Sequence, residues 1–202
     1  MPVHVPLTSC KPNAMTESLE RQLDSFDPVQ RRSALSDLWR QAQEGRIALP
    51  EAGTDVNLHA HTFFSYNTYG YSPSKYAWLA RKAGLAVAGI VDFDVLDGLD
   101  EFLEAGRLIG LKTCVSLESR VFMPELATRV INSPGAPGVA YHMGVGFTKA
   151  VRLPFSTGMR AAAAQRTRDI AVRVNTCMRP VELDYEKDVV PLTPNAIFGV
   201  LR

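Results

Sequence analysis

Two histidines form the motif of this sequence with the clearest chemical use. The chain has only four histidines, and His59 and His61 stand one residue apart. The segment from Val56 to His61 alternates apolar and polar residues, which indicates a β-strand with one buried face. Side chains two positions apart on a strand point to the same side, so both imidazoles could bind one metal ion. A pair of exposed or hydrogen-bonded histidines fits a lone His-x-His motif equally well.

Carboxylates and a further histidine lie near the ends of the later predicted strands. Asp92 and Asp94 come just after an apolar run, Glu118 ends the next predicted strand, and His142 begins the one after that. In parallel α/β folds the carboxyl ends of the strands converge on the active site. Imidazoles and carboxylates gathered there would suit Zn, Mn or Fe. Taken singly, each has another explanation: a strand-end aspartate often caps a helix, Glu118 could pair with Arg120, and His142 could be a hydrogen-bonded core histidine.

Alternating strand and helix patterns must position these side chains. The apolar run from Leu85 to Val91 is typical of a parallel strand buried on both faces. Strands and helices that alternate at this spacing predict an α/β fold with a parallel sheet or barrel. The predicted parallel strands are 56–61, 85–92, 112–118 and 141–147. The predicted helices are 73–83, 97–110 and 156–178, and residues 123–140 are predicted to form a loop.

The sequence divides into three predicted parts. Residues 1–15 are predicted to be a flexible tail. Residues 16–54 are predicted to form an antiparallel helical pair and a linker, because Asp27-Pro28 is typical of an N-cap followed by a proline at the first helical position. Residues 55–202 are predicted to form the β/α domain.

The residues of this domain resemble a known family of enzymes. The segment from His59 to Ser65 reads His-Ala-His-Thr-Phe-Phe-Ser, and Asp92-Phe93-Asp94, Glu118 and His142 follow in order. Over roughly residues 55–147 the chain is similar to the PHP (polymerase and histidinol phosphatase) family of metal-dependent phosphoesterases. The resemblance implies a distorted seven-stranded β/α barrel whose two or three metal ions activate water for attack on a phosphate ester. It also implies that His59, His61, Glu118 and His142 are metal ligands. Asp92 is the predicted catalytic group, which would bind or orient a ligand.

Three departures from the family pattern shape the expectation. Phe93 stands where the family has a histidine ligand, and the segment after Ser65 lacks the usual Asp or His. Barrels of this kind need about 250 residues, and the residues from Asp55 onward are far fewer. We therefore expect only the N-terminal part of the domain, a partial barrel that is incomplete at its C-terminus and able to self-associate.

The predicted helix 156–178 is rich in arginine. Seven basic residues and one acid lie between Lys149 and Arg179. A basic helix beside a metal site would attract phosphate, which makes Arg160 and Arg166 candidate substrate-binding residues. A solvated helix face is the alternative.

Composition sets broad limits. The 22 basic and 21 acidic residues give a net charge of +1, which offers no argument for nucleic acid or for an anionic membrane as a partner. No apolar run has the length of a membrane span, and the N-terminus does not have the pattern of a signal peptide. Three cysteines without a CxxC spacing favour a reducing interior, so we expect a cytoplasmic protein.

The leading functional hypothesis is metal-dependent hydrolysis of a small-molecule phosphate ester. One alternative is a catalytically degenerate domain that binds a metal ion or a ligand without turnover. Another is a truncated fragment without activity.

Overall fold

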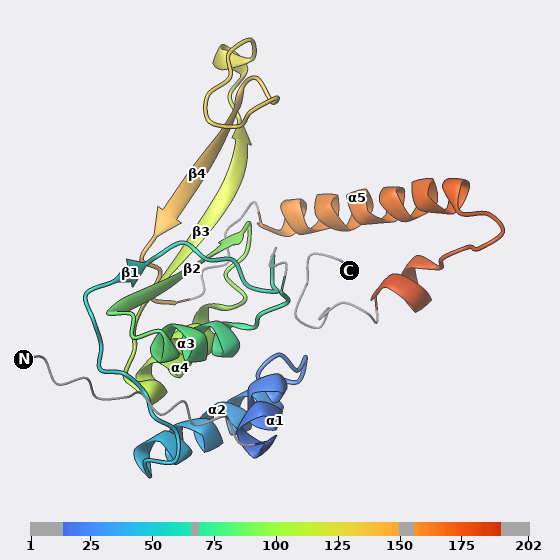
Figure 1. The fold of residues 1–202 in the computed structure, drawn as a ribbon. Helices are drawn as coiled ribbons and strands as arrows, with labels where there is room; N and C mark the ends of the chain where they lie inside the picture. Colours follow the sequence, from blue (N-terminus) through green and yellow to red (C-terminus); the bar gives the residue numbers. More distant parts are fainter. Residues whose placement is uncertain (1–13, 66–68, 150–155, 191–202) are drawn as a thin grey trace, which may run out of the picture.

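The computed structural model describes residues 14–65, 69–149 and 156–190 (Figure 1). The strands are β1 (Val56–Asn57), β2 (Val87–Phe93), β3 (Lys112–Phe122) and β4 (Val139–Val145). The α-helices are α1 (Ala14–Gln22), α2 (Pro28–Gln43), α3 (Pro73–Lys82), α4 (Leu99–Ile109) and α5 (Ser156–Cys177). Two short helices, η1 (Pro124–Leu126) and η2 (Tyr185–Val189), complete the described elements.

The four strands form one curled sheet, a half-barrel, in the order β1-β2-β3-β4. β1, β2 and β3 run parallel, whereas β4 runs antiparallel to β3. The prediction that 141–147 is a further parallel strand is therefore wrong. A parallel partner needs a crossover connection, usually a helix that packs on the sheet. Residues 123–138 contain only the single turn of η1, and the chain returns as a hairpin in which the Met123 amide donates to the Gly138 carbonyl at 2.7 Å.

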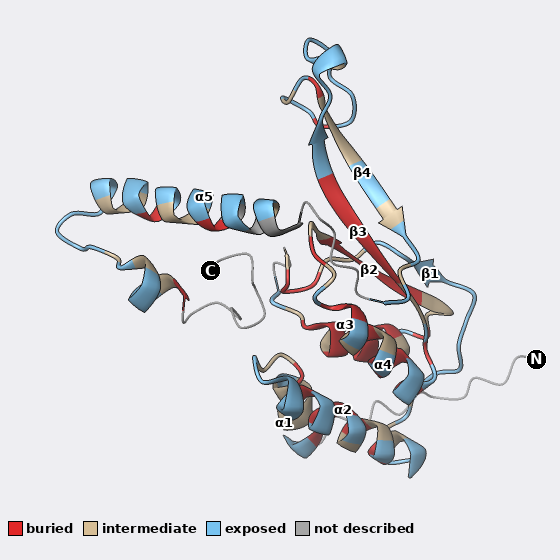
Figure 2. Ribbon diagram, turned by 180° about the vertical axis from the view of Figure 1, so that it is seen from behind, coloured by how far each residue is buried: buried red, intermediate tan, exposed pale blue. Residues whose placement is uncertain are grey.

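Helices cover one face of the sheet. α3 packs on β2 and α4 on β3, and α1 and α2 lie outside these two helices (Figure 1). The buried core contains Trp78, Ile90, Phe102 and Val115, which are at most 2% exposed. Figure 2 shows this burial concentrated in β2, in part of β3 and in α3 and α4, whereas β4 is intermediate to exposed and the far end of the hairpin is largely exposed.

Local signals set where two helices begin. The Asp27 carboxylate accepts a hydrogen bond from the Val29 amide at 2.9 Å, and Pro28 is the first residue of α2. The Ser72 hydroxyl accepts from the Lys75 amide at 2.9 Å, and α3 begins at Pro73. In both cases a side-chain oxygen satisfies an amide that has no partner within the helix, and the proline occupies a position that needs no donor.

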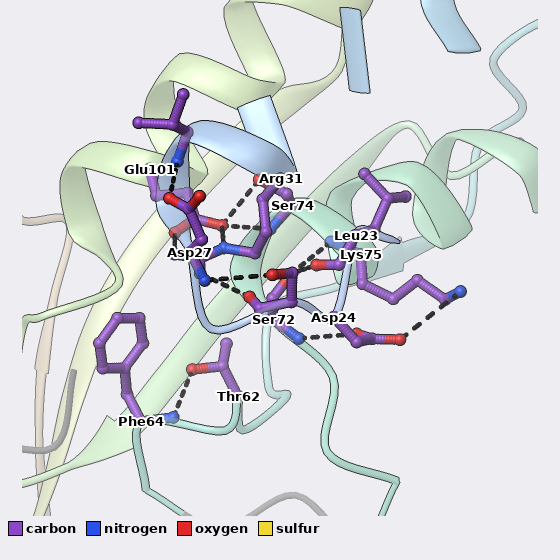
Figure 3. Close-up of polar contacts among 12 residues, drawn as sticks. Leu23, Asp24, Asp27, Arg31, Thr62, Phe64, Ser72, Ser74, Lys75 and Glu101 are labelled. Atoms are coloured by element: carbon purple, nitrogen blue, oxygen red, sulfur yellow. Dashed lines mark hydrogen bonds and ion pairs between the residues drawn. The ribbon is translucent and has the colours of Figure 1, made fainter. Parts of the chain in front are cut away.

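Buried polar contacts fasten α1 and α2 to the rest of the molecule (Figure 3). Arg31 on α2 is 2% exposed and donates through Nε to Glu101 Oε1 at 2.9 Å, and its Nη2 contacts the other oxygen of Glu101. Glu101 on α4 also accepts from the Ser74 amide at 3.1 Å and from the Ser74 hydroxyl at 2.7 Å. The Ser72 hydroxyl, in turn, donates to the Leu23 carbonyl. One carboxylate thus joins α2, α3 and α4.

A second contact joins α1 to α3 through Glu20. Glu20 Oε1 accepts from Trp78 Nε1 at 2.8 Å and from Lys82 Nζ at 2.6 Å. Burial alone would raise the pKa of Glu20, but these two hydrogen bonds and the nearby ammonium groups outweigh it and lower the pKa below the usual 4.5. The ionised Glu20 carboxylate therefore stabilises the folded state.

The segment that carries the His-x-His motif runs beside β2. Only Val56 and Asn57 form the regular ladder, but the Val91 amide also donates to the Ala60 carbonyl at 2.8 Å. A Cβ added to Gly89 would lie 2.8 Å from the backbone of Leu58. The glycine at this position of β2 therefore allows the histidine-bearing segment to lie directly against the strand.

α5 extends away from the sheet, and η2 folds back along it (Figure 1). Arg168 on α5 pairs with Glu186 at 3.0 Å, and the Asn175 side chain exchanges two hydrogen bonds with the backbone of Leu183. Within the described part of the chain, no helix is both long enough and apolar enough to cross a membrane.

Candidate metal centre

Two imidazoles converge on one carboxylate at the carboxyl ends of the strands. His59 Nε2 lies 3.2 Å and His61 Nε2 3.7 Å from Glu118 Oε2. One ligand atom from each residue lies within 4.8 Å of the others. His59 and His61 come from the segment after β1, and Glu118 comes from β3. The strand predicted over 56–61 ends at Asn57 in the structure, but both imidazoles lie on the side of Glu118, as expected.

The environment of Glu118 favours a cation at this point. Its side chain is 9% exposed, and Oε2 is buried and accepts no hydrogen bond in the structure. A buried carboxylate oxygen without a donor is costly in free energy. A divalent ion held between this oxygen and the two imidazole nitrogens would supply the missing partner. Two nitrogen donors and one carboxylate oxygen fit Zn, Mn or Fe.

The tautomer of His61 supports the same conclusion. The Ser65 hydroxyl donates its single proton to Asp92 Oδ1 at 2.7 Å, so it can only accept from His61 Nδ1, which lies 3.4 Å away. The neutral tautomer with its proton on Nδ1 fits this contact, and it directs Nε2 toward Glu118 as a metal-binding nitrogen. Burial lowers the pKa of His61, against the attraction of Asp92 and Glu118, and thus favours the neutral imidazole that binds metals.

Asp92 lies behind these ligands. It is 2% exposed and accepts from the Thr62 amide, the Thr62 hydroxyl and the Ser65 hydroxyl, each at 2.7 Å. Burial raises the pKa of Asp92, although the three hydrogen bonds oppose the shift. We expected a catalytic group here, but all the contacts of this carboxylate go to the turn that carries His61. The catalytic role of Asp92 stays a prediction.

Sequence reasoning did not assign a role to the two hydroxyl residues of this turn. Thr62 links Asp92 to the backbone, and its Oγ1 also accepts from the Phe64 amide at 3.2 Å (Figure 3). Ser65 joins Asp92 to His61. The sequence could have predicted these contacts, because both hydroxyls lie within four residues after the second histidine and a buried aspartate needs hydrogen-bond donors.

An aromatic ring borders the candidate site. Phe93 stacks on His61 with ring centroids 4.5 Å apart and an interplanar angle of 19°. It pairs in register with Glu118, so the two side chains lie on the same face of the sheet. The apolar ring that was expected beside the metal ligands is therefore present. The next residue, Asp94, has a φ of 61° and a buried Oδ1 without a hydrogen bond in the structure.

His142 does not join the cluster. It pairs across β3 and β4 with Ser119, whereas Glu118 pairs with Met143. Because side chains alternate along a strand, His142 lies on the opposite face of the sheet from Glu118, and it is exposed. The expectation that His142 shares a metal ion with His59 and Glu118 rested on a parallel fourth strand. The antiparallel register of β4 removes that basis.

The arginines of the basic helix are not brought to the cluster in the described part of the chain. Arg166 is exposed on α5, which leads away from the sheet (Figure 1). Arg160 lies on the same helix, but its side chain falls outside the described residues. Their role as substrate-binding residues stays a prediction.

A solved structure has a similar fold over about half of its own length. A crystal structure of a Bifidobacterium adolescentis protein named as a metal-dependent phosphoesterase matches with a TM-score of 0.53 and 24% identity, over 75% of this chain and 48% of that one. An amidohydrolase from Chromobacterium violaceum, solved with bound sulfate and no metal, matches with a TM-score of 0.49 and 16% identity, over 64% of this chain and 41% of that one. This chain thus spans about half the length of the structures it resembles. No protein-family model and no curated protein matches the sequence.

Proposed function

We propose that this chain is a metal-dependent hydrolase of phosphate esters. One observation carries the proposal: a buried oxygen of Glu118 that accepts no hydrogen bond lies 3.2 Å from His59 Nε2 and 3.7 Å from His61 Nε2. A divalent cation bound by these three atoms would compensate the negative charge of the buried carboxylate. The similar fold of a metal-dependent phosphoesterase and the resemblance of residues 55–147 to the PHP family support phosphate esters as the substrate class.

The residues of the site would have separate roles in metal binding and in positioning. His59, His61 and Glu118 would hold the ion, which when bound polarises phosphoryl oxygens and lowers the pKa of water toward neutrality. Ser65 holds the proton of His61 on Nδ1 and thereby keeps Nε2 available. Asp92 accepts the hydrogen bond of the Ser65 hydroxyl and thereby holds Ser65 in place beside His61.

Metal content is the first test. Elemental analysis of the purified full chain, loaded with Zn or Mn and then dialysed, should find bound metal in the wild type and little in His59→Ala or Glu118→Gln. Glu118→Gln keeps the shape of the side chain but removes the charge. His142→Ala is the matched control and should retain metal, since that histidine lies on the other face. Full metal content in Glu118→Gln, or its loss in His142→Ala, would contradict the proposed ligand set.

Turnover is the second test. The metal-loaded wild type should hydrolyse a generic ester such as p-nitrophenyl phosphate, slowly but measurably above Glu118→Gln. Addition of a chelator should abolish the difference between the two proteins. A rate that is the same in both proteins before chelation would argue against hydrolysis at this site.

Phe93 favours a second candidate, a metal-binding domain without turnover. Its ring stacks on His61 where the PHP pattern has a ligand, and an apolar ring donates no lone pair. We therefore expect at most one tightly held ion per chain. Phe93→His should raise the metal-to-protein ratio or tighten binding, because it adds an imidazole on the face of Glu118. Metal titration by calorimetry measures this, and two tight equivalents in the wild type would refute the expectation.

A further inference from the structure

Arg120 lies on the same face of the sheet as the candidate metal ligand Glu118. The two residues are two positions apart on β3, so their side chains point to the same side. Tyr141 pairs with Arg120 across β4 and therefore shares this face. The Arg120 guanidinium carbon lies 5.8 Å from the centroid of the Tyr141 ring, a distance typical of a cation–π contact.

A continuous row of rings joins this guanidinium to the metal ligands. His61 stacks on Phe93 at 4.5 Å, and the Phe93 ring lies 6.3 Å from that of Tyr141. The row runs from the segment after β1, across β2, to β4, and Glu118 and Arg120 lie on the strand between. The guanidinium and the candidate metal centre are therefore parts of one surface.

Arg120 is available to an anion. Its side chain is exposed, and within residues 14–65, 69–149 and 156–190 no carboxylate forms an ion pair with it. Alternate residues on a strand are about 7 Å apart, a span that an arginine side chain can bridge. The planar guanidinium presents paired donors that match the oxygens of a phosphoryl group. Stacking on Tyr141 already restricts the Arg120 side chain, so less conformational entropy is lost when the side chain binds an anion.

We propose that Arg120 binds the phosphoryl oxygens of the substrate beside the metal centre and that Tyr141 is its positioning residue. The proposal rests on the proposed function, since the phosphoryl group is recognised at that same site. It assigns to β3 the phosphate-binding role that the sequence suggested for the arginines of α5.

Binding of inorganic phosphate to the metal-loaded full chain tests the proposal. Calorimetric titration should show that Arg120→Met weakens phosphate binding about tenfold or more, the loss expected for hydrogen bonds to a charged group. Arg120→Lys should lie in between, because it keeps the charge but loses the paired donors. Tyr141→Leu should weaken binding about threefold, whereas Tyr141→Phe should retain it. Arg107→Met, an exposed arginine on α4, is the control.

The metal content of every variant separates this proposal from the proposed function. Phosphate affinity that is unchanged in Arg120→Met at full metal content overturns the role of Arg120 and leaves the metal site intact. A wild type that binds metal but no phosphate also overturns the role of Arg120 and leaves the metal site intact. A wild type without metal overturns the proposed function. Phosphate titrated into that metal-free chain still tests Arg120. If the metal-free wild type binds phosphate and Arg120→Met does not, the assignment of Arg120 is supported. Any other result refutes it.

Discussion

Replacing Arg31 by methionine should destabilise the protein much more than the same change one residue later. The Arg31 side chain is 2% exposed and contacts both oxygens of Glu101, and its Nη1 donates to the Ser25 carbonyl at 2.7 Å. Its guanidinium carbon also lies 5.2 Å from the centroid of Phe63, in the turn that follows His61. Methionine keeps much of the volume but none of the donors.

The expected loss follows from the burial of the pair. Removing one partner of a buried ion pair costs about 3–5 kcal/mol, because the other charge stays behind without compensation. Glu101 is 20% exposed and retains both hydrogen bonds from Ser74, so the loss in the free energy of unfolding should lie near the lower limit, about 3 kcal/mol. The neighbouring pair of Arg32 and Glu104 is 75% and 49% exposed with a 3.5 Å separation, so Arg32→Met should cost about 0.5 kcal/mol or less.

Urea unfolding of the two variants, followed by circular dichroism, measures the difference. The slope of the free energy with denaturant should stay that of the wild type, so that the shift in midpoint reports stability alone. The double variant Arg31→Met/Glu101→Gln should recover part of the loss, since no buried charge then remains unpaired. If Arg31→Met costs no more than Arg32→Met, the assignment of this contact as a buried, stabilising pair is wrong.

Two further changes test the packing around the site. The pKa of Glu20 is lowered in the folded state, so Glu20 contributes stability above pH 4.5 that is lost as the pH falls through the folded pKa. Glu20→Gln should remove this pH dependence of the free energy of unfolding, which Trp78 fluorescence measures. An equally steep pH dependence in the variant would contradict the role of Lys82 and Trp78. Gly89→Ala should cost about 1–3 kcal/mol in urea unfolding and also reduce metal content, because the added methyl meets backbone. Gly158→Ala is the control: its methyl meets nothing, and because Gly158 lies in α5 the change should leave stability unchanged or raise it. Equal stability of the two variants would refute the close approach at β2.

Some of the fold could be predicted because its causes are local. Asp27-Pro28 and Ser72-Pro73 start helices through contacts within three residues, and the structure has α2 and α3 beginning at these prolines. The apolar run before Asp92 became a strand that is buried over Ala88–Asp92. Such signals depend on hydrogen bonds and periodicity along the chain, which are written in the sequence.

The site was predicted in part for the same reason. The spacing of His59 and His61 brings both imidazoles to one carboxylate. The prediction that the strand ends at Glu118 was wrong, since β3 continues to Phe122, but Glu118 pairs with Phe93 at the carboxyl end of β2. The role of Asp92 was harder to predict, because only the folded turn shows that Thr62 and Ser65 occupy its oxygens. A carboxylate at a strand end looks the same in sequence whether it faces a ligand or a hydroxyl.

The sequence by itself determined the types and spacing of the candidate ligands, the helix starts and the buried second strand. Only the tertiary structure decided the direction of β4, and with it the place of His142. Direction depends on whether the connecting residues build a crossover or a hairpin, and a shift of one position in register moves a side chain to the other face of the sheet. The same register places Arg120 and Tyr141 together on the face of Glu118. These pairings join residues about 20 or more positions apart, so no local pattern contains them.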